Sequence, residues 1–200
     1  MKGKLYIFEG PDGVGKTTLS KLATDLLNSA GQPAEWLSFP GREPGTLGRL
    51  AYDVHHEPRK MGVNHLTDAA KQTLHIAAHL DAIESTIQPL LTAGTHVILD
   101  RFWWSTWVYG LTSGLNEDLL RALIAVERFG WGTTLPSMLL LVDAKRPRDR
   151  ADEKMPHFRA LSDAYKKLAA QESATFAVRT LNNDGALTHT QQALEALLFS

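Results

Sequence analysis

The sequence has 200 residues, with 21 basic and 22 acidic side chains, a formal net charge of −1 and no cysteine. This length suits one domain over residues 1–200, and the missing cysteine excludes disulfides and thiolate metal sites. Balanced charge makes long nucleic acid an unlikely partner, because proteins that follow a phosphate backbone usually carry positive charge. The N-terminus leaves no room for a signal peptide, and no apolar run approaches the roughly 20 residues of a membrane span. We therefore expect a cytoplasmic protein with no membrane partner.

Short apolar runs alternate with longer helical patterns, which is typical of a parallel sheet with crossover helices. Residues 5–8 predict a buried first strand, 17–30 a helix and 35–39 a second strand. Residues 66–93 form the longest helical pattern, with apolar side chains at helical spacing. Pro89 lies within it and should distort its last turns.

The second half of the chain continues this alternation. The predicted elements are a strand at 96–99, a helix at 116–129, a strand at 138–142, a helix at 157–171, a strand at 175–181 and a helix at 188–198. Residues 144–157 are charged and contain two prolines, and we interpret them as a short lid. The pattern predicts a three-layer α/β/α fold around a five-stranded parallel sheet.

A glycine-rich turn joins the first strand to the first helix. The sequence Gly10-Pro11-Asp12-Gly13-Val14-Gly15-Lys16-Thr17 matches the full G-x-x-x-x-G-K-[ST] spacing of a P-loop. Its glycines let backbone N–H groups form a cradle for phosphates, and the helix N-terminus adds its positive dipole end. Lys16 suits the β- and γ-phosphates, and the Thr17 hydroxyl suits Mg²⁺. We assign this turn and Thr18 to nucleoside triphosphate binding, a property that kinases share with GTPases and ATPases.

Four ordered segments, 8–18, 42–48, 87–94 and 100–109, carry further motifs. They read F-E-G-x-D followed by the P-loop, R-E-P-G-T-L-G, I-x-P-x-L-x-x-G and D-R-F-x-x-S-x-x-x-Y. In these motifs the chain resembles the thymidylate kinases. The resemblance implies a P-loop kinase fold, ATP and Mg²⁺ as cofactors, and transfer of the γ-phosphate to dTMP or a related pyrimidine deoxynucleotide. It also implies a homodimer that involves the long helix.

The resemblance assigns roles to individual side chains. Asp12 would contact the acceptor sugar, and Tyr109 would pack under the deoxyribose. Arg42 and Arg101 would hold the acceptor phosphate, a task that suits guanidinium groups because they stay charged and donate two hydrogen bonds at once. The catalytic candidates are Lys16, Arg42, Arg101, Asp12 and Arg150, and the Mg²⁺ ligands are Thr17 and Asp100. The alternative for Arg42 and Arg101 is a surface ion pair, with Glu43 or Asp100 as the partner.

The lid segment contains several arginines, including Arg146, Arg148 and Arg150. The resemblance implies that one or two of them reach the transition state, where they would neutralise charge on the phosphates. The alternative for any one of them is a solvated charged turn.

The acceptor base site departs from the family pattern. His75 and His79 stand where the family has a stacking phenylalanine and a base-reading arginine. The predicted substrate-binding set is Asp12, Phe39, Arg42, His75, His79, Arg101, Ser105, Thr106 and Tyr109. Aromatic residues at 102–107 either pack the core, which we favour, or line an enlarged pocket. Two alternatives remain open: a kinase acting on a modified-base deoxynucleotide or on a base hydroxyl in DNA, and a non-catalytic nucleotide-binding protein.

Overall fold

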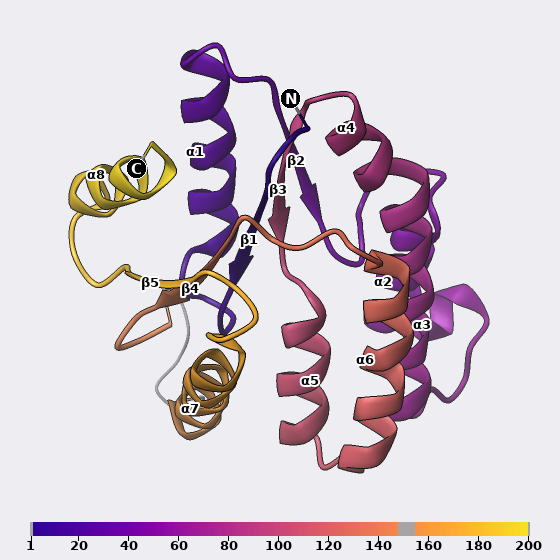
Figure 1. Ribbon diagram of the computed structural model, residues 1–200. Coiled ribbons are helices and arrows are strands. Elements are labelled where there is room, and N and C mark those ends of the chain that lie inside the picture. Colours follow the sequence, from indigo (N-terminus) through magenta and orange to yellow (C-terminus); the bar gives the residue numbers. More distant parts are fainter. Residues whose placement is uncertain (1, 148–154, 200) are drawn as a thin grey trace.

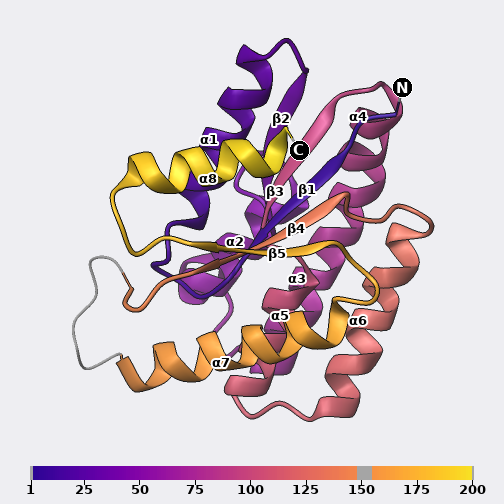
Figure 2. The same cartoon turned by 60° about the vertical axis from the view of Figure 1, so that its left-hand side comes forward.

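The computed structural model describes residues 2–147 and 155–199. A single five-stranded sheet forms the centre of this part of the chain, with helices on both of its faces (Figures 1 and 2). Half of the predicted lid, residues 148–154 with Arg148 and Arg150, lies outside the described residues. Among the described helices, none combines the length and the apolar character that crossing a membrane would need.

All five strands run parallel, in the spatial order β2-β3-β1-β4-β5. They are β1 (Leu5–Glu9), β2 (Ala34–Ser38), β3 (His96–Asp100), β4 (Met138–Asp143) and β5 (Val178–Asn182). The predicted fold class and all five strands are confirmed, with boundaries shifted by at most three residues. Because the strands are parallel, their carboxyl ends meet at one edge, where α/β proteins usually bind ligands.

The helices divide between the two faces of the sheet (Figures 1 and 2). One face carries α1 (Lys16–Ser29) and α8 (Leu187–Leu198). The rest of the described helices are α2 (Leu47–His56), a 3₁₀ turn (Pro58–Met61), α3 (Asp68–Ala82), α4 (Gln88–Thr92), α5 (Trp103–Thr112), α6 (Glu117–Trp131) and α7 (Met155–Glu172). The sequence pattern did not predict α2 or α5. Helix α5 is rich in aromatic residues, which are weak helix formers, so tertiary packing decides its conformation.

The predicted long helix is interrupted rather than continuous. A π-helical turn over Ile83–Ile87 separates α3 from α4, and the N–H of Gln88 donates to the carbonyl of Ile83. Pro89 follows directly and has no N–H to donate, so a regular α-helical hydrogen bond is missing at this point. The expected distortion by Pro89 is therefore confirmed, one turn earlier than the proline itself.

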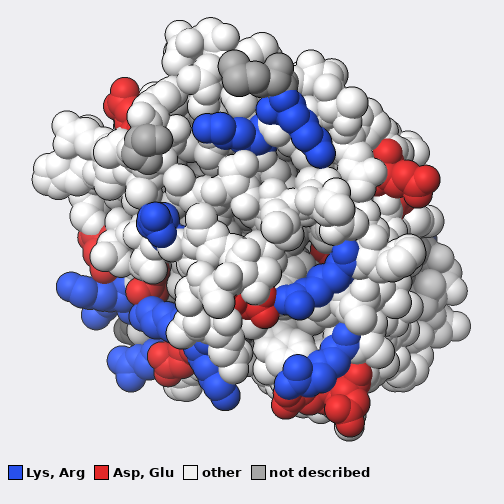
Figure 3. Space-filling view, in the orientation of Figure 1, with Lys and Arg blue, Asp and Glu red and all other residues white. Residues whose placement is uncertain are grey.

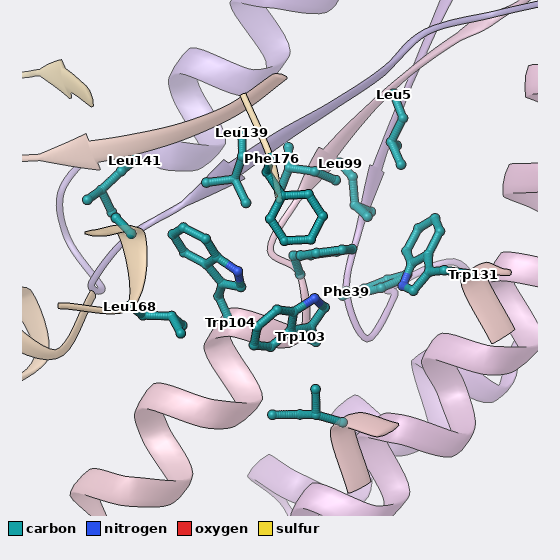
Figure 4. Close-up of a cluster of buried hydrophobic side chains, with 14 of the residues drawn as sticks. Leu5, Phe39, Leu99, Trp103, Trp104, Trp131, Leu139, Leu141, Leu168 and Phe176 are labelled. Carbon is teal, nitrogen blue, oxygen red and sulfur yellow. The ribbon is translucent and has the colours of Figure 1, made fainter. Parts of the chain in front are cut away.

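Two hydrophobic clusters hold the layers together. The cluster on the side of α5, α6 and α7 contains many aromatic rings, several of which Figure 4 shows between the sheet and the helices. Phe102, Trp103 and Trp104 are at most 2% exposed within it, which confirms that these side chains pack the core. Burying one such side chain contributes about 1.5–3 kcal/mol, so this cluster fixes α5 against the ends of the strands.

Charged side chains are dispersed over the surface. On the face in Figure 3, basic and acidic residues lie among one another, without one continuous basic area. This arrangement agrees with the formal net charge of −1. The described residues on that face therefore form no extended positive track for a nucleic acid backbone.

Candidate active site

A cavity of about 610 Å³ opens at the carboxyl ends of β1, β2 and β3. It runs from the P-loop to the side chains of α3, and most of the predicted site lies on it. The predicted residues that line it are Asp12, Gly13, Gly15, Lys16, Thr17, Thr18, Phe39, Arg42, His75, His79, Asp100, Arg101, Ser105, Thr106 and Tyr109. The remaining P-loop residues, Gly10, Pro11 and Val14, are buried and do not line the cavity. Thus the fold brings together segments that are far apart in the sequence.

The P-loop adopts backbone conformations that require glycine. Gly15 has a φ of 92°, and a Cβ there would lie 2.5 Å from the side-chain nitrogen of Asn183. Asn183, just after β5, donates through Nδ2 to the carbonyl of Val14 at 2.8 Å. This contact between Asn183 and the P-loop was not predicted, because the sequence does not reveal that β5 ends beside the loop.

The side chain of Lys16 folds back onto the loop. It is 5% exposed, and its Nζ donates to the carbonyl of Pro11 at 2.7 Å. Burial, together with the charge of Arg101, lowers the pKa of Lys16 to about 7. An incoming anion would therefore both attract this group and favour its protonated form.

Thr17, in the first turn of α1, contacts Asp100, the last residue of β3. The Thr17 hydroxyl donates to Asp100 Oδ2 at 2.6 Å, while Oδ1 of the same carboxylate is buried and has no hydrogen-bond partner among the described residues. An unpaired buried oxygen beside a P-loop hydroxyl fits a hydrated Mg²⁺ ion. Within residues 2–147 and 155–199, no group of three or more histidine or acidic side chains could hold a metal alone. Mg²⁺ here would need phosphate oxygens and water as further ligands.

Asp12 and Arg101 form an ion pair across the cavity floor. The backbone of Arg101 has a φ of 79°, a left-handed conformation that is rare for residues other than glycine. The N–H of Asp12 donates to the hydroxyl of Tyr109 at 3.1 Å, and the Arg101 guanidinium lies 5.5 Å from the Tyr109 ring. Burial raises the pKa of Tyr109 to about 12, so its hydroxyl keeps its proton. The three side chains form one connected unit.

Glu9 accepts hydrogen bonds from several groups that lie next to this unit. Its carboxylate is fully buried and accepts hydrogen bonds from the N–H groups of Phe102 and Ser105, at 2.7 and 3.0 Å. It also accepts from the hydroxyls of Ser105 and Tyr165, at 2.9 and 3.1 Å. Burial raises the pKa of Glu9. Ser105 in turn accepts from Arg101 Nη1 at 3.0 Å, so this predicted substrate contact also supports the arginine.

Arg42 lies near the opposite end of the cavity. Its guanidinium is 4.7 Å from the ring centroid of Tyr52 on α2. Among the described residues Arg42 has no ion-pair partner, and Arg101 pairs with Asp12 rather than with Asp100. The alternative surface ion pairs are therefore not formed. Tyr52 was missed because α2 was not predicted.

His79 is held on two sides. Its ring stacks on Phe39, with centroids 4.0 Å apart and planes 12° apart. Its Nδ1 lies 2.8 Å from Glu127 Oε2, and Glu127 also accepts from Trp131 Nε1 at 3.2 Å. Glu127 is fully buried on α6, so a carboxylate from a neighbouring helix fixes this histidine.

His75 faces a second histidine across the cavity wall. Its Nε2 lies 2.9 Å from Nδ1 of His55, and one of these two nitrogens donates to the other. Burial, together with the neighbouring His79, lowers the pKa of His75 to about 3. His75 is therefore neutral at physiological pH, and its Nε2 is already engaged with His55.

Comparisons with known proteins agree with this geometry. A family model described as Thymidylate kinase matches residues 8–184. The chain is 29% identical to a thymidylate kinase of Rhizorhabdus wittichii, over 98% of both sequences. It is also 29% identical to one of Pelotomaculum thermopropionicum, over 99% of the chain and 97% of that sequence. The crystal structure of thymidylate kinase from Ehrlichia chaffeensis has the same fold, with a TM-score of 0.76, 19% identity and coverage of 99% and 100%.

Proposed function

Because the chain belongs to the thymidylate kinase family, we propose that it transfers the γ-phosphate of ATP to dTMP, forming dTDP and ADP. The observation that carries this proposal is the grouping of Lys16, Arg42 and Arg101 around one cavity. Bringing a monophosphate against a triphosphate requires several positive charges on both sides of the transferred group. A P-loop without the two arginines would bind a nucleotide but would offer little to a second phosphate.

The donor end would hold ATP with Mg²⁺. Lys16 would leave the carbonyl of Pro11 for the phosphates, and the P-loop N–H groups would surround the β-phosphate. Thr17 and the free oxygen of Asp100 would hold the hydrated metal ion. When bound, this ion would neutralise charge on the phosphates of ATP.

The acceptor end would hold dTMP between the P-loop and α3. Arg42 and Arg101 would hold its phosphate in line with the γ-phosphate, since a guanidinium can donate two hydrogen bonds to one phosphate. Asp12 and Tyr109 would face the sugar from the floor of the cavity. Arg150 remains a proposed catalytic residue of the lid. We also propose a single catalytic domain and a cytoplasmic location, since the reaction consumes ATP and a free nucleotide.

An acceptor panel tests this function. The purified chain is incubated with MgATP and, separately, dTMP, dUMP, dCMP, a 5-substituted dUMP and single-stranded DNA, and ADP release and product are measured. We expect dTMP to give the highest kcat/KM. Faster turnover of a modified nucleotide or of DNA would favour the alternative acceptors, for which the comparisons give no support. ATP binding without transfer to any acceptor would indicate a non-catalytic nucleotide-binding protein.

We further propose a homodimer that buries the outer face of α6, which packs beside α3. Leu119, Val126 and Phe129 recur at helical spacing on α6 and are 37%, 50% and 88% exposed. Large apolar side chains aligned in this way often mark a protein interface. A second copy would cover them in an isologous contact, which is the commonest arrangement for homodimers.

A further inference from the structure

Among the described residues that line the cavity, Asp100 and Gln72 each have a buried side-chain oxygen without a hydrogen-bond partner. Asp100 Oδ1 lies at the donor end, where the proposed metal ion accounts for it. Gln72 Oε1 belongs to α3, at the acceptor end, and nothing in the proposed chemistry so far accounts for it. Gln72 is 8% exposed. A buried amide oxygen without a donor is unfavourable, so a ligand donor is the expected partner.

The position of Gln72 on its helix directs it to the same wall as the two histidines. Gln72, His75 and His79 are spaced i, i+3 and i+7, which places them on one face of α3, and all three line the cavity. Only the two histidines stand at positions of the family motif. The helical spacing adds Gln72 to them.

Other polar side chains on the cavity already use one polar atom each within the protein. His75 uses Nε2 with His55, and His79 uses Nδ1 with Glu127. The indole of Trp36, also on the cavity, donates to Ser20 at 2.8 Å. None of the hydrogen bonds between described residues involves the amide of Gln72, so neither its buried oxygen nor its nitrogen is committed to another described side chain or backbone group.

We infer that Gln72 reads the acceptor base, with its amide paired to the N3–H and 4-oxo group of a pyrimidine. Its Oε1 accepts from N3–H while its Nε2 donates to O4, the bidentate arrangement that an amide can offer to a base edge. The inference rests on the proposed function, because it assumes that a pyrimidine nucleotide occupies the cavity. Base recognition is thereby assigned to Gln72, which lies outside the motif positions. At the motif positions themselves, His75 and His79 replace the family residues.

Enzyme variants and a modified nucleotide together test this assignment. Gln72→Met keeps the length of the side chain and removes both polar atoms. The matched control is Gln88→Met on α4, where the amide donates to the carbonyl of Gly130 instead of lining the cavity. The nucleotide is an analogue of dTMP with a hydrogen in place of O4, which therefore also lacks the N3 proton. KM and kcat are measured with both nucleotides, and binding is measured by calorimetry.

For dTMP, we expect Gln72→Met to raise KM about tenfold, with kcat within about threefold of wild type. Wild type and Gln88→Met should bind the analogue about tenfold more weakly than dTMP, whereas Gln72→Met should bind both within about threefold. Equal binding of dTMP and the analogue by the wild-type protein would overturn the assignment without any variant. A Gln72→Met protein that still binds dTMP about tenfold more tightly than the analogue would also overturn it. Failure of the wild type to phosphorylate any pyrimidine nucleotide would instead reject the proposed function.

Discussion

The carboxylate of Asp12 and the guanidinium of Arg101 form an ion pair, although the two residues are 89 positions apart in sequence. Burial opposes ionisation of Asp12, but the charges of Arg101 and Lys16 outweigh it and lower the pKa of Asp12 to about 2. The pair is therefore ionised at neutral pH. It ties the P-loop, which would hold the phosphate donor, to an arginine that would hold the acceptor.

Replacing Asp12 by asparagine should impair use of the acceptor while leaving ATP binding intact. Arg101 would lose its charged partner and the acceptor sugar its carboxylate, so kcat/KM for dTMP should fall about 10- to 100-fold. The affinity for ATP, measured by calorimetry, should stay equal or rise slightly, because Lys16 loses a neighbouring negative charge. Asp25→Asn, an exposed site on α1, serves as the control. Unchanged acceptor kinetics in Asp12→Asn would contradict the proposed role.

Removing Arg42 should affect the acceptor and spare the donor. In Arg42→Ala we expect KM for dTMP to rise about 10- to 100-fold, since a charge-assisted contact to phosphate is lost. The dissociation constant for ATP should change by less than about threefold, because the P-loop is intact. Arg49→Ala on α2 is the control, because this exposed arginine pairs with Asp53 and does not line the cavity. An Arg42→Ala protein with the wild-type KM would exclude this arginine from the phosphate site.

Binding of ATP should draw a proton onto Lys16. With a pKa of about 7, close to half of the free protein carries a neutral Lys16 at pH 7. Phosphates stabilise the charged form, so MgATP binding should take up about half a proton per site at pH 7. Calorimetry in buffers of different ionisation enthalpy measures this uptake. Lys16→Arg stays protonated and should show almost none, and an equal uptake in that variant would assign the proton to another group.

Glu9→Gln should destabilise the fold. The variant keeps one acceptor oxygen but places an NH₂ group against N–H and O–H donors, which should lower the free energy of unfolding by about 2–4 kcal/mol. Burial raises the pKa of Glu9 above its ordinary value of 4.5, so the wild-type protein loses stability when Glu9 ionises as the pH rises. The variant has no such group. The difference in the free energy of unfolding between wild type and variant should therefore become smaller from acidic to neutral pH, as measured by denaturant unfolding. Glu35→Gln on β2, an exposed glutamate, should change stability by less than about 0.5 kcal/mol.

Phe129→Asp should dissociate the proposed homodimer. A charged group at the most exposed position of the apolar stripe on α6 would have to be desolvated on association, so the dimer dissociation constant should rise at least about 100-fold. Sedimentation velocity at several concentrations measures the change. Phe199→Asp, on the 44% exposed side chain that follows α8, is the control. A wild-type protein that sediments as a monomer at high concentration would reject the dimer directly.

Local sequence patterns were sufficient for most of the fold. The P-loop spacing, the apolar strands and the helix expected at 116–129 depend on neighbouring residues, and all lie within a few residues of where they were expected. Helices α2 and α5 were missed because the propensity of their sequences is weak, and packing of the aromatic side chains of α5 against the sheet stabilises that helix instead.

The sequence by itself determined that this chain binds a nucleoside triphosphate, because the P-loop works through backbone N–H groups held by glycines within eight consecutive residues. Its motifs also predicted which arginines would serve the acceptor, and both of them line the cavity. Only the tertiary structure decided how those side chains are held and which residues lie beside them. Glu127 fixes His79 from another helix, and the buried Oε1 of Gln72 has no hydrogen-bond partner among the described residues. Hydrogen bonding and burial depend on distances across the fold, which no spacing along the chain records.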